Sequence, residues 1–128
     1  MPESRICAAA LALALTASSA AAAEYDRQFY TGEALHQRCA AAPADADYAA
    51  RRAACRGYIL GVSDAIQAAQ GAAQGSSSGA RPTVCLGEVE ADRLVEQVAG
   101  YLAAHPENRR YAASDVIAVA LKATYPCR

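Results

Sequence analysis

Residues 55–65, CRGYILGVSDA, lie in the middle of the longest helical pattern of the sequence, which spans about residues 48–73. Each residue of an α-helix turns by about 100°, so the large apolar side chains gather on one face. That face consists of Tyr48, Cys55, Tyr58, Ile59, Val62, Ile66 and Ala69. Small residues occupy the roughly opposite face, namely Gly57, Gly61, Ala65, Ala68 and Ala72. The pattern predicts a central helix that is buried on two sides.

The N-terminal stretch is typical of a secretory signal peptide. Arg5 precedes an apolar run over residues 6–17, and three alanines precede Glu24. A transmembrane anchor is the alternative, but it needs about 20 strongly apolar residues, and alanines and serines dilute this run. We expect a signal peptide over residues 1–23, a single domain over residues 24–128, and no stable membrane span in the mature protein.

The net charge of −1 is spread without any basic run, which argues against nucleic-acid binding. The sequence contains no C-x-x-C pair, and neither His36 nor His105 has a second ligand type at helical spacing. We therefore expect no metal and no cofactor.

Four cysteines remain after the expected cleavage: Cys39, Cys55, Cys85 and Cys127. An even number in a small exported domain indicates disulfides, although four thiols allow three pairings. If the first two helices form an antiparallel hairpin, Cys39 comes close to Cys55, and Cys85 is left to pair with Cys127. Such closed loops would contribute about 3 and about 4 kcal/mol, respectively, in the chain-entropy model.

The helices on either side of the central pattern have recognisable ends. Thr31 is typical of an N-cap for a short first helix, and Asp45 or Asp47 is suited to cap the long one. A third helix should follow an acidic cluster that complements its dipole, and should end near His105-Pro106. The cluster is Glu88, Glu90 and Asp92, and the apolar face beyond it is Leu94, Val95, Val98, Tyr101 and Leu102.

The C-terminal part predicts one more helix. Arg109-Arg110 should lie in a solvated loop, with contact to an acidic partner as the alternative, and Ser114 should be the N-cap. The apolar residues after Ser114 face several directions, so this helix should be substantially enclosed. No run alternates with the period of a strand. The expected fold is all-α, a compact bundle of about four helices stabilised by two disulfides.

A catalytic centre is not indicated. Residues 61–65, GVSDA, lack the final glycine of a nucleophile elbow and lie within a helix. The glycines of residues 71–79 are not followed by the lysine of a phosphate-binding loop. We therefore expect a protein that is not an enzyme.

Two features favour contact with a partner. The first is the glycine- and serine-rich loop 75–82, whose candidates are Gly75, Ser76, Ser77, Ser78, Gly79 and Arg81. A simple surface connector is the alternative. The second is the Gly57-x-x-x-Gly61 spacing, which admits a close helix from the same chain or from a second copy. Asp64 borders that face and should bond to a neighbouring helix.

Across nearly the whole mature chain, the sequence resembles the Rap/Tai family of immunity proteins, which protect bacteria against type VI secreted peptidoglycan amidases. The shared residues are Thr31-Gly32 with Leu35 and Cys39, Cys55-x-Gly57-Tyr58-Ile59-x-Gly61-Val62-x-Asp64-Ala65, Cys85, Tyr101-Leu102-x-x-His105-Pro106-Glu107, and Leu121 with Tyr125-Pro126-Cys127. The sequence departs from the family pattern at Gly87, where a proline is expected, and in loop 75–82. For that reason no inhibitory residue is carried over.

The resemblance implies a small, exported, all-helical protein that is disulfide-stabilised, often dimeric, and blocks a cell-wall amidase by binding it. The expected partners are a cognate peptidoglycan amidase effector and, as a possible homodimer, a second copy. The alternative function is a periplasmic stress or chaperone-like helical binding protein of the HdeA type, which its size and disulfide use also permit.

Overall fold

The computed structural model describes residues 30–77 and 79–128, and these residues form an all-α fold. The expected signal peptide, residues 1–23, lies outside them. The helices are α2 (Gly32–Cys39), α3 (Tyr48–Gln74), α4 (Ala91–Ala104) and α5 (Ala113–Thr124), with a short 3-10 helix, η1 (Pro106–Asn108), between α4 and α5. The described residues contain no strand, only the isolated bridges Thr31↔Ala112 and Val84↔Pro126.

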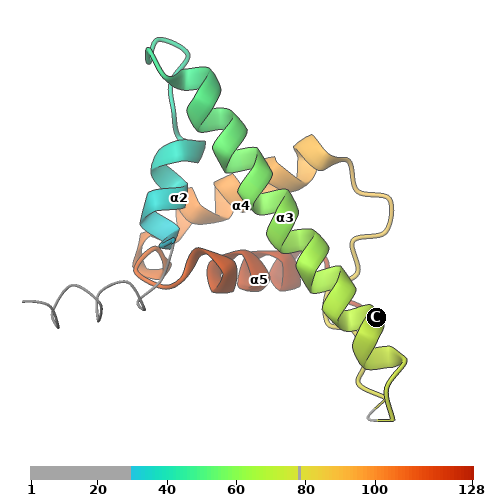
Figure 1. Cartoon of the computed structure of the whole chain (residues 1–128). Helices are drawn as coiled ribbons and strands as arrows, with labels where there is room; N and C mark the ends of the chain where they lie inside the picture. The colour runs from blue at the N-terminus through green and yellow to red at the C-terminus, as the bar shows by residue number, and fades with distance from the viewer. Residues whose placement is uncertain (1–29, 78) are drawn as a thin grey trace, which may run out of the picture.

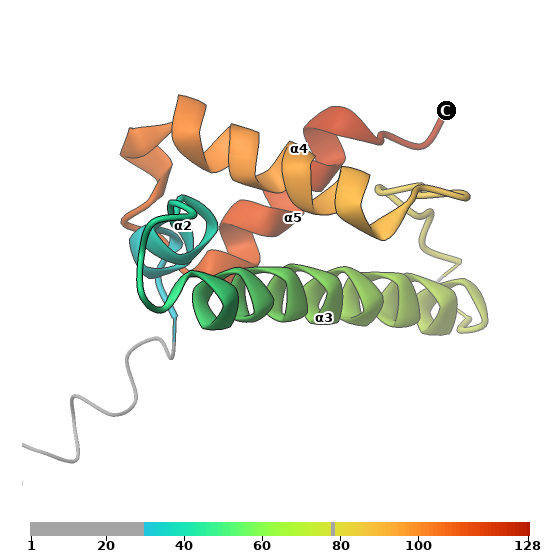
Figure 2. The same cartoon turned by 90° about the horizontal axis from the view of Figure 1, so that it is seen from above.

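Helix α3 is the long element against which the other helices pack. Its 27 residues correspond to about 40 Å. Figure 2 shows α2, α4 and α5 together on one side of α3. All four helices contribute to the core, whose largest fully buried side chains are Leu35, Cys55, Ile59, Val98, Leu102, Ile117 and Leu121. The predicted all-α bundle of about four helices is confirmed.

Both disulfides have the predicted pairing. Cys39–Cys55 joins the end of α2 to α3, and its sulfurs lie in the core. Cys85–Cys127 joins the segment before α4 to the C-terminus, where Cys85 is exposed and Cys127 is half-buried. The two disulfides therefore lie in very different environments, one in the core and one at the surface.

The predicted helix caps are right in one case and wrong in two. The Thr31 hydroxyl accepts the Ala34 N–H, as predicted. Neither Asp45 nor Asp47 caps α3 with its side chain, because both carboxylates pair with Arg51, at 3.2 and 3.7 Å. Ser114 is not an N-cap, since α5 already begins at Ala113.

The early start of α5 has a tertiary cause. The Ala113 N–H donates to the Tyr30 carbonyl at 2.9 Å, and Thr31 pairs with Ala112. This pairing fixes the chain just before α5 in an extended conformation, so the helix begins where the pairing ends. A local sequence signal does not contain that information.

One expectation about burial is also wrong, because the small-residue face of α3, including Gly57 and Gly61, is exposed instead of buried. Helix α5 is enclosed on the face of Val116, Ile117, Ala120 and Leu121, whereas Val119 is 52% exposed. No helix in the described ranges is both long and apolar enough to cross a membrane.

Candidate partner-binding surface

The C-terminal end of α3 projects from the helical body and carries loop 75–82 at its tip (Figure 1). Within α3 the last fully buried residue is Ser63, although the helix continues to Gln74. The Ser63 hydroxyl donates to the Ile59 carbonyl at 2.7 Å, so this serine has a structural role. The loop is thus presented about three turns beyond the last core residue of its helix.

The loop exposes nearly all of its candidate residues: Gly75, Ser76, Ser77, Gly79 and Arg81. Ser78 lies outside the described residues. The Gly79 N–H donates to the Ser76 carbonyl at 3.1 Å, and Gly79 has a φ of +54°, a left-handed conformation that glycine adopts without strain. Among the described residues, Arg81 makes no side-chain hydrogen bond or ion pair, so its charge is available to a partner.

The base of the loop is held by a residue that the sequence did not single out. The Gln70 side chain bonds to the main chain of Thr83 and Val84, and Val84 is 3% exposed. On the helical wheel Gln70 is one of several polar residues of α3, with Gln67 and Gln74. The sequence feature that could have indicated its role is its position shortly before a loop that has to return to the core.

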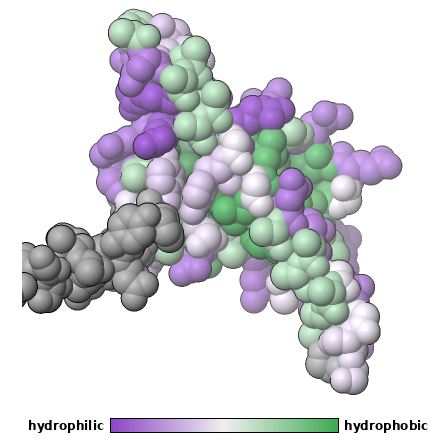
Figure 3. Space-filling model, viewed as in Figure 1, coloured by the Kyte–Doolittle hydropathy of each residue, from purple (hydrophilic) through white to green (hydrophobic). Residues whose placement is uncertain are grey.

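The small-residue face of α3 has no covering element in the described chain. A Cβ atom added at Gly57 or Gly61 would meet no atom within 4 Å. Figure 3 shows weakly apolar and neutral side chains along α3 on this face. Asp64 lies on it, exposed, and has no hydrogen-bond or ion-pair partner in the ranges described. The expected close helix is not supplied by this chain, and its supply by a second copy stays a prediction.

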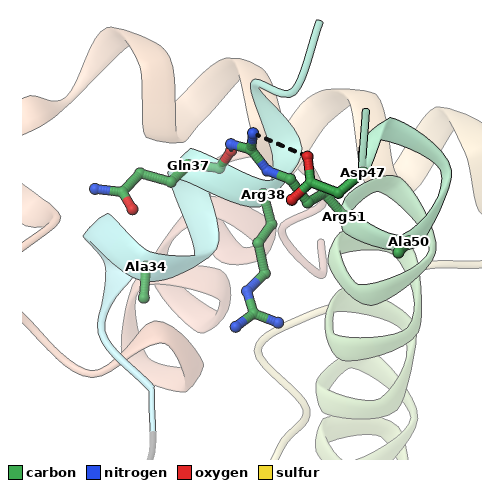
Figure 4. A pocket seen from close by; sticks show the side chains of 6 residues that line it. All are labelled: Ala34, Gln37, Arg38, Asp47, Ala50 and Arg51. Carbon is green, nitrogen blue, oxygen red and sulfur yellow. Dashed lines mark hydrogen bonds and ion pairs between the residues drawn. The ribbon is translucent and has the colours of Figure 1, made fainter. Parts of the chain in front are cut away.

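A surface pocket of about 390 Å³ lies between α2 and the start of α3 (Figure 4). Arg51 projects into it, but this guanidinium pairs with Asp45 and Asp47 and donates to the Gln37 carbonyl. The contacts of Arg51 join α2 to α3. Arg38, the other arginine that lines the pocket, lies 4.9 Å from the centre of the Tyr30 ring and forms no ion pair among the described residues.

An apolar groove of about 220 Å³ lies at the junction of α4 and α5. Tyr111, 47% exposed, and Val119 lie beside Tyr101 and Val116 there. The sequence did not indicate this groove, because Val119 was expected to be enclosed.

The predicted solvated loop at Arg109-Arg110 is wrong for Arg109. Its side chain donates to the carbonyls of Leu102 and Ala103, at 2.7 and 3.1 Å, and so caps the end of α4. Its own carbonyl accepts the Glu33 N–H at 2.8 Å. Arg109 thus links α2 to α4 and is not free for an acidic partner.

The titratable groups with shifted pKa values lie away from loop 75–82 in sequence. Burial and the nearby Arg109 lower the pKa of His36, and Glu33 partly offsets them. Burial, with Tyr30 and Asp115, raises the pKa of Tyr58. Hydrogen bonds from its own backbone and from His105 lower the pKa of Glu107.

His105, the other histidine of the chain, also has local partners. His105 Nδ1 lies 3.0 Å from Glu107 Oε1, and its ring packs against Tyr101. In the part of the chain that the structure describes, no three His, Cys, Asp or Glu side chains gather into a possible metal site.

A comparison with protein families identifies the family of this chain. The family of Rap1a immunity proteins matches residues 31–127, which include all four helices and both disulfides. No curated protein matches the chain. The resemblance inferred from the sequence is therefore confirmed, and the chain belongs to the Rap1a immunity protein family.

Proposed function

We propose that this protein is a periplasmic immunity protein that binds a type VI secreted peptidoglycan amidase and blocks its active site without catalysis of its own. Membership of an immunity protein family supports protection against a secreted effector. The two disulfides are typical of proteins that work in an oxidising compartment. The family match favours this function over the HdeA-type alternative.

The observation that carries the proposal is the projection of loop 75–82 on the end of the long helix α3. An enzyme that cleaves a polymer binds it in a groove, and a narrow, convex element is suited to fill a groove. A stable interface buries about 800 Å² on each partner, more than eight loop residues supply. The exposed alanines before the loop, Ala68 and Ala72, extend the surface with side chains short enough for close approach.

The charge of Arg81 gives the proposed interface a specific polar contact. This guanidinium is exposed and unpaired among the described residues, so a carboxylate of the effector can bind it without breaking an existing ion pair. Its removal should weaken binding more than the removal of an arginine elsewhere on the surface.

Periplasmic co-expression tests the proposal. The amidase encoded nearby, if there is one, is exported with and without this protein, and lysis is followed by culture density. Rescue by the wild-type chain and loss of rescue by Arg81→Glu are the expected results. Failure of the wild-type chain to prevent lysis would remove the immunity function for that pair.

Arg93→Glu is the matched control. Arg93 is also exposed, but it lies on α4 and makes only a weak surface pair with Glu96 at 3.9 Å. The charge change is the same, so equal loss of rescue by both variants would argue against loop 75–82 as the contact.

We also propose that a second copy covers the part of the small-residue face that lies away from the loop, around Gly57, Gly61 and Asp64. Absence of side chains at the two glycines permits close helix packing, and this face is uncovered in the chain itself. Light scattering should show a wild-type dimer and a monomer for Gly61→Leu. A wild-type monomer at high concentration would contradict the dimer.

A further inference from the structure

We propose that Gln70 is a positioning residue that holds loop 75–82 in its partner-binding conformation. This inference rests on the proposed function, since it concerns the same loop. In this proposal, one side chain outside the loop keeps the loop in an ordered conformation. Its basis is the set of hydrogen bonds between α3 and the segment that follows the loop.

The end of α3 needs such a support. No residue of α3 after Ser63 is fully buried, and residues 67–69, 71, 72 and 74 are exposed. A two-turn helical end without packing frays readily in water, because short helices are only marginally stable. The loop begins at Gly75, so fraying of this end would release the loop as well.

Gln70 uses both ends of its amide on the returning chain. Its Oε1 accepts the N–H groups of Thr83 and Val84, at 2.8 and 2.9 Å, and its Nε2 donates to the Val84 carbonyl at 2.9 Å. The side chain thus binds the main chain as a neighbouring peptide group would. Gln67 adds a longer bond to the same carbonyl, at 3.3 Å.

The opposite side of this segment is also fixed. The Cys85 N–H donates to the Tyr125 carbonyl at 2.9 Å, and the disulfide ties Cys85 to Cys127. Val84 is buried in the core. Residues 83–85 therefore stay in place without Gln70, and what Gln70 adds is the attachment of the projecting helix end to this fixed segment.

Loss of this attachment should affect the loop and leave the core intact. With Gln70 in place, the unsupported stretch is residues 71–82, between Gln70 and Thr83. Without it, that stretch begins three residues earlier, after Gln67, whose longer bond to the Val84 carbonyl remains. A partner that needs the ordered loop must then order more backbone, which lowers the affinity.

Gln70→Ala in the mature protein tests the proposal, and Gln74→Ala is its matched control. Gln74 is on the same helix, one turn later, and its side chain makes no hydrogen bond among the described residues. The two changes have the same effect on helix propensity. Gln70→Glu is a third variant, because it keeps acceptors for the two N–H groups but loses the donor to Val84.

The first measurement is amide hydrogen exchange over residues 71–84 in the free protein. We expect at least about tenfold faster exchange in Gln70→Ala, an intermediate increase in Gln70→Glu, and no change in Gln74→Ala, because ordering of about one residue corresponds to about tenfold. The thermal midpoint should stay close to that of the wild type. Unchanged exchange, or a large drop in thermal midpoint, would overturn the positioning role.

The second measurement is affinity for the amidase that the wild-type protein neutralises, with Arg81→Glu in parallel. Gln70→Ala should weaken binding on the order of tenfold, and Gln74→Ala should not. Faster exchange with unchanged affinity would overturn the inference. If the wild-type protein binds no amidase, the proposed function fails, and the exchange result still decides whether Gln70 orders the loop.

Discussion

The two ends of α3 are attached by similar means but in different environments. At the N-terminal end the disulfide Cys39–Cys55 is buried, and Arg52 donates to the Cys39 carbonyl at 2.9 Å. At the C-terminal end the disulfide Cys85–Cys127 is at the surface, and Gln70 binds the main chain of Val84. At both ends a polar side chain of α3 binds main-chain atoms of another segment, but only the first disulfide has a cysteine in α3, and the second fixes the segment that Gln70 binds.

The difference separates the scaffold from the presented surface. The N-terminal end shares in the hydrophobic core, so its attachment is part of global stability. The C-terminal end is attached through polar contacts outside the core, and local opening there exposes little apolar surface. One helix therefore combines a rigid base with an end whose order is set separately.

Full reduction should have the largest effect, because it acts on both ends. The chain-entropy model assigns about 3 kcal/mol to the short loop and about 4 kcal/mol to the long one, which together approach the net stability of a small domain. We expect the reduced protein to be largely unfolded or to melt far lower. Circular dichroism during heating, with and without reductant, measures this, and unchanged melting would contradict it.

Gly32→Ala should have the next largest effect, and it acts where the start of α2 packs against Arg109, the residue after η1. A Cβ atom at Gly32 would lie 2.9 Å from the Arg109 Cα, and Arg109 cannot easily retreat because its carbonyl accepts the Glu33 N–H. Overpacking of this kind costs about 1–3 kcal/mol. Urea denaturation should show that loss.

Gly61→Ala is the control for Gly32→Ala. An added methyl group there meets no atom within 4 Å, and alanine is favoured over glycine in a helix by about 1 kcal/mol. In dilute solution, where the chain is monomeric, the free energy of unfolding should therefore rise slightly. A loss similar to that of Gly32→Ala at concentrations that favour the proposed dimer would show that the face around Gly61 is covered there.

Mild reduction should separate the two disulfides. A thiolate must reach a sulfur in line with the bond, and only Cys85–Cys127 is accessible in the folded state. We expect it to open at least about tenfold faster than Cys39–Cys55. Alkylation and mass spectrometry of the trapped cysteines give the order, and simultaneous opening would mean that the protein unfolds as a unit.

The smallest expected effect is a dependence of stability on pH through His36 of α2. The pKa of His36 is lowered in the folded state, so the unfolded chain binds the proton first as the pH falls. Stability should be full above pH of about 6.5 and decrease below it, down to the folded pKa. Urea titrations should show less of this decrease in His36→Gln, and identical profiles would contradict the assignment.

Much of the scaffold could be predicted because local patterns encode it. The period of apolar residues gave the four helices, Thr31 gave one cap, and the hairpin argument gave the cysteine pairing. Several of the errors depend on contacts between residues far apart in the chain, whereas the cap of α3 was missed because of the nearby Arg51. Ser114 is an example of the first kind, because pairing with Tyr30 moved the start of α5.

The candidate surface was predictable only in part. Composition identified loop 75–82, but it did not show that Gln70 supports the loop or that Arg109 caps α4. A helical wheel shows where a polar side chain lies on a helix, but not whether it contacts water or a main-chain group far away in the sequence. The small face of α3 has the same ambiguity, since Gly57 and Gly61 fit a covered or an open face equally well.

The contact between Gln70 and the returning chain bears on how the loop can change over time. Gln70 binds main-chain atoms of Thr83 and Val84, and those atoms are present whatever side chains the preceding residues carry. Substitutions between Gly75 and Pro82 can therefore accumulate without weakening this anchor. With the proposed effector contact at loop 75–82, the sequence of the loop can change as effectors diverge, while the core stays under separate constraint.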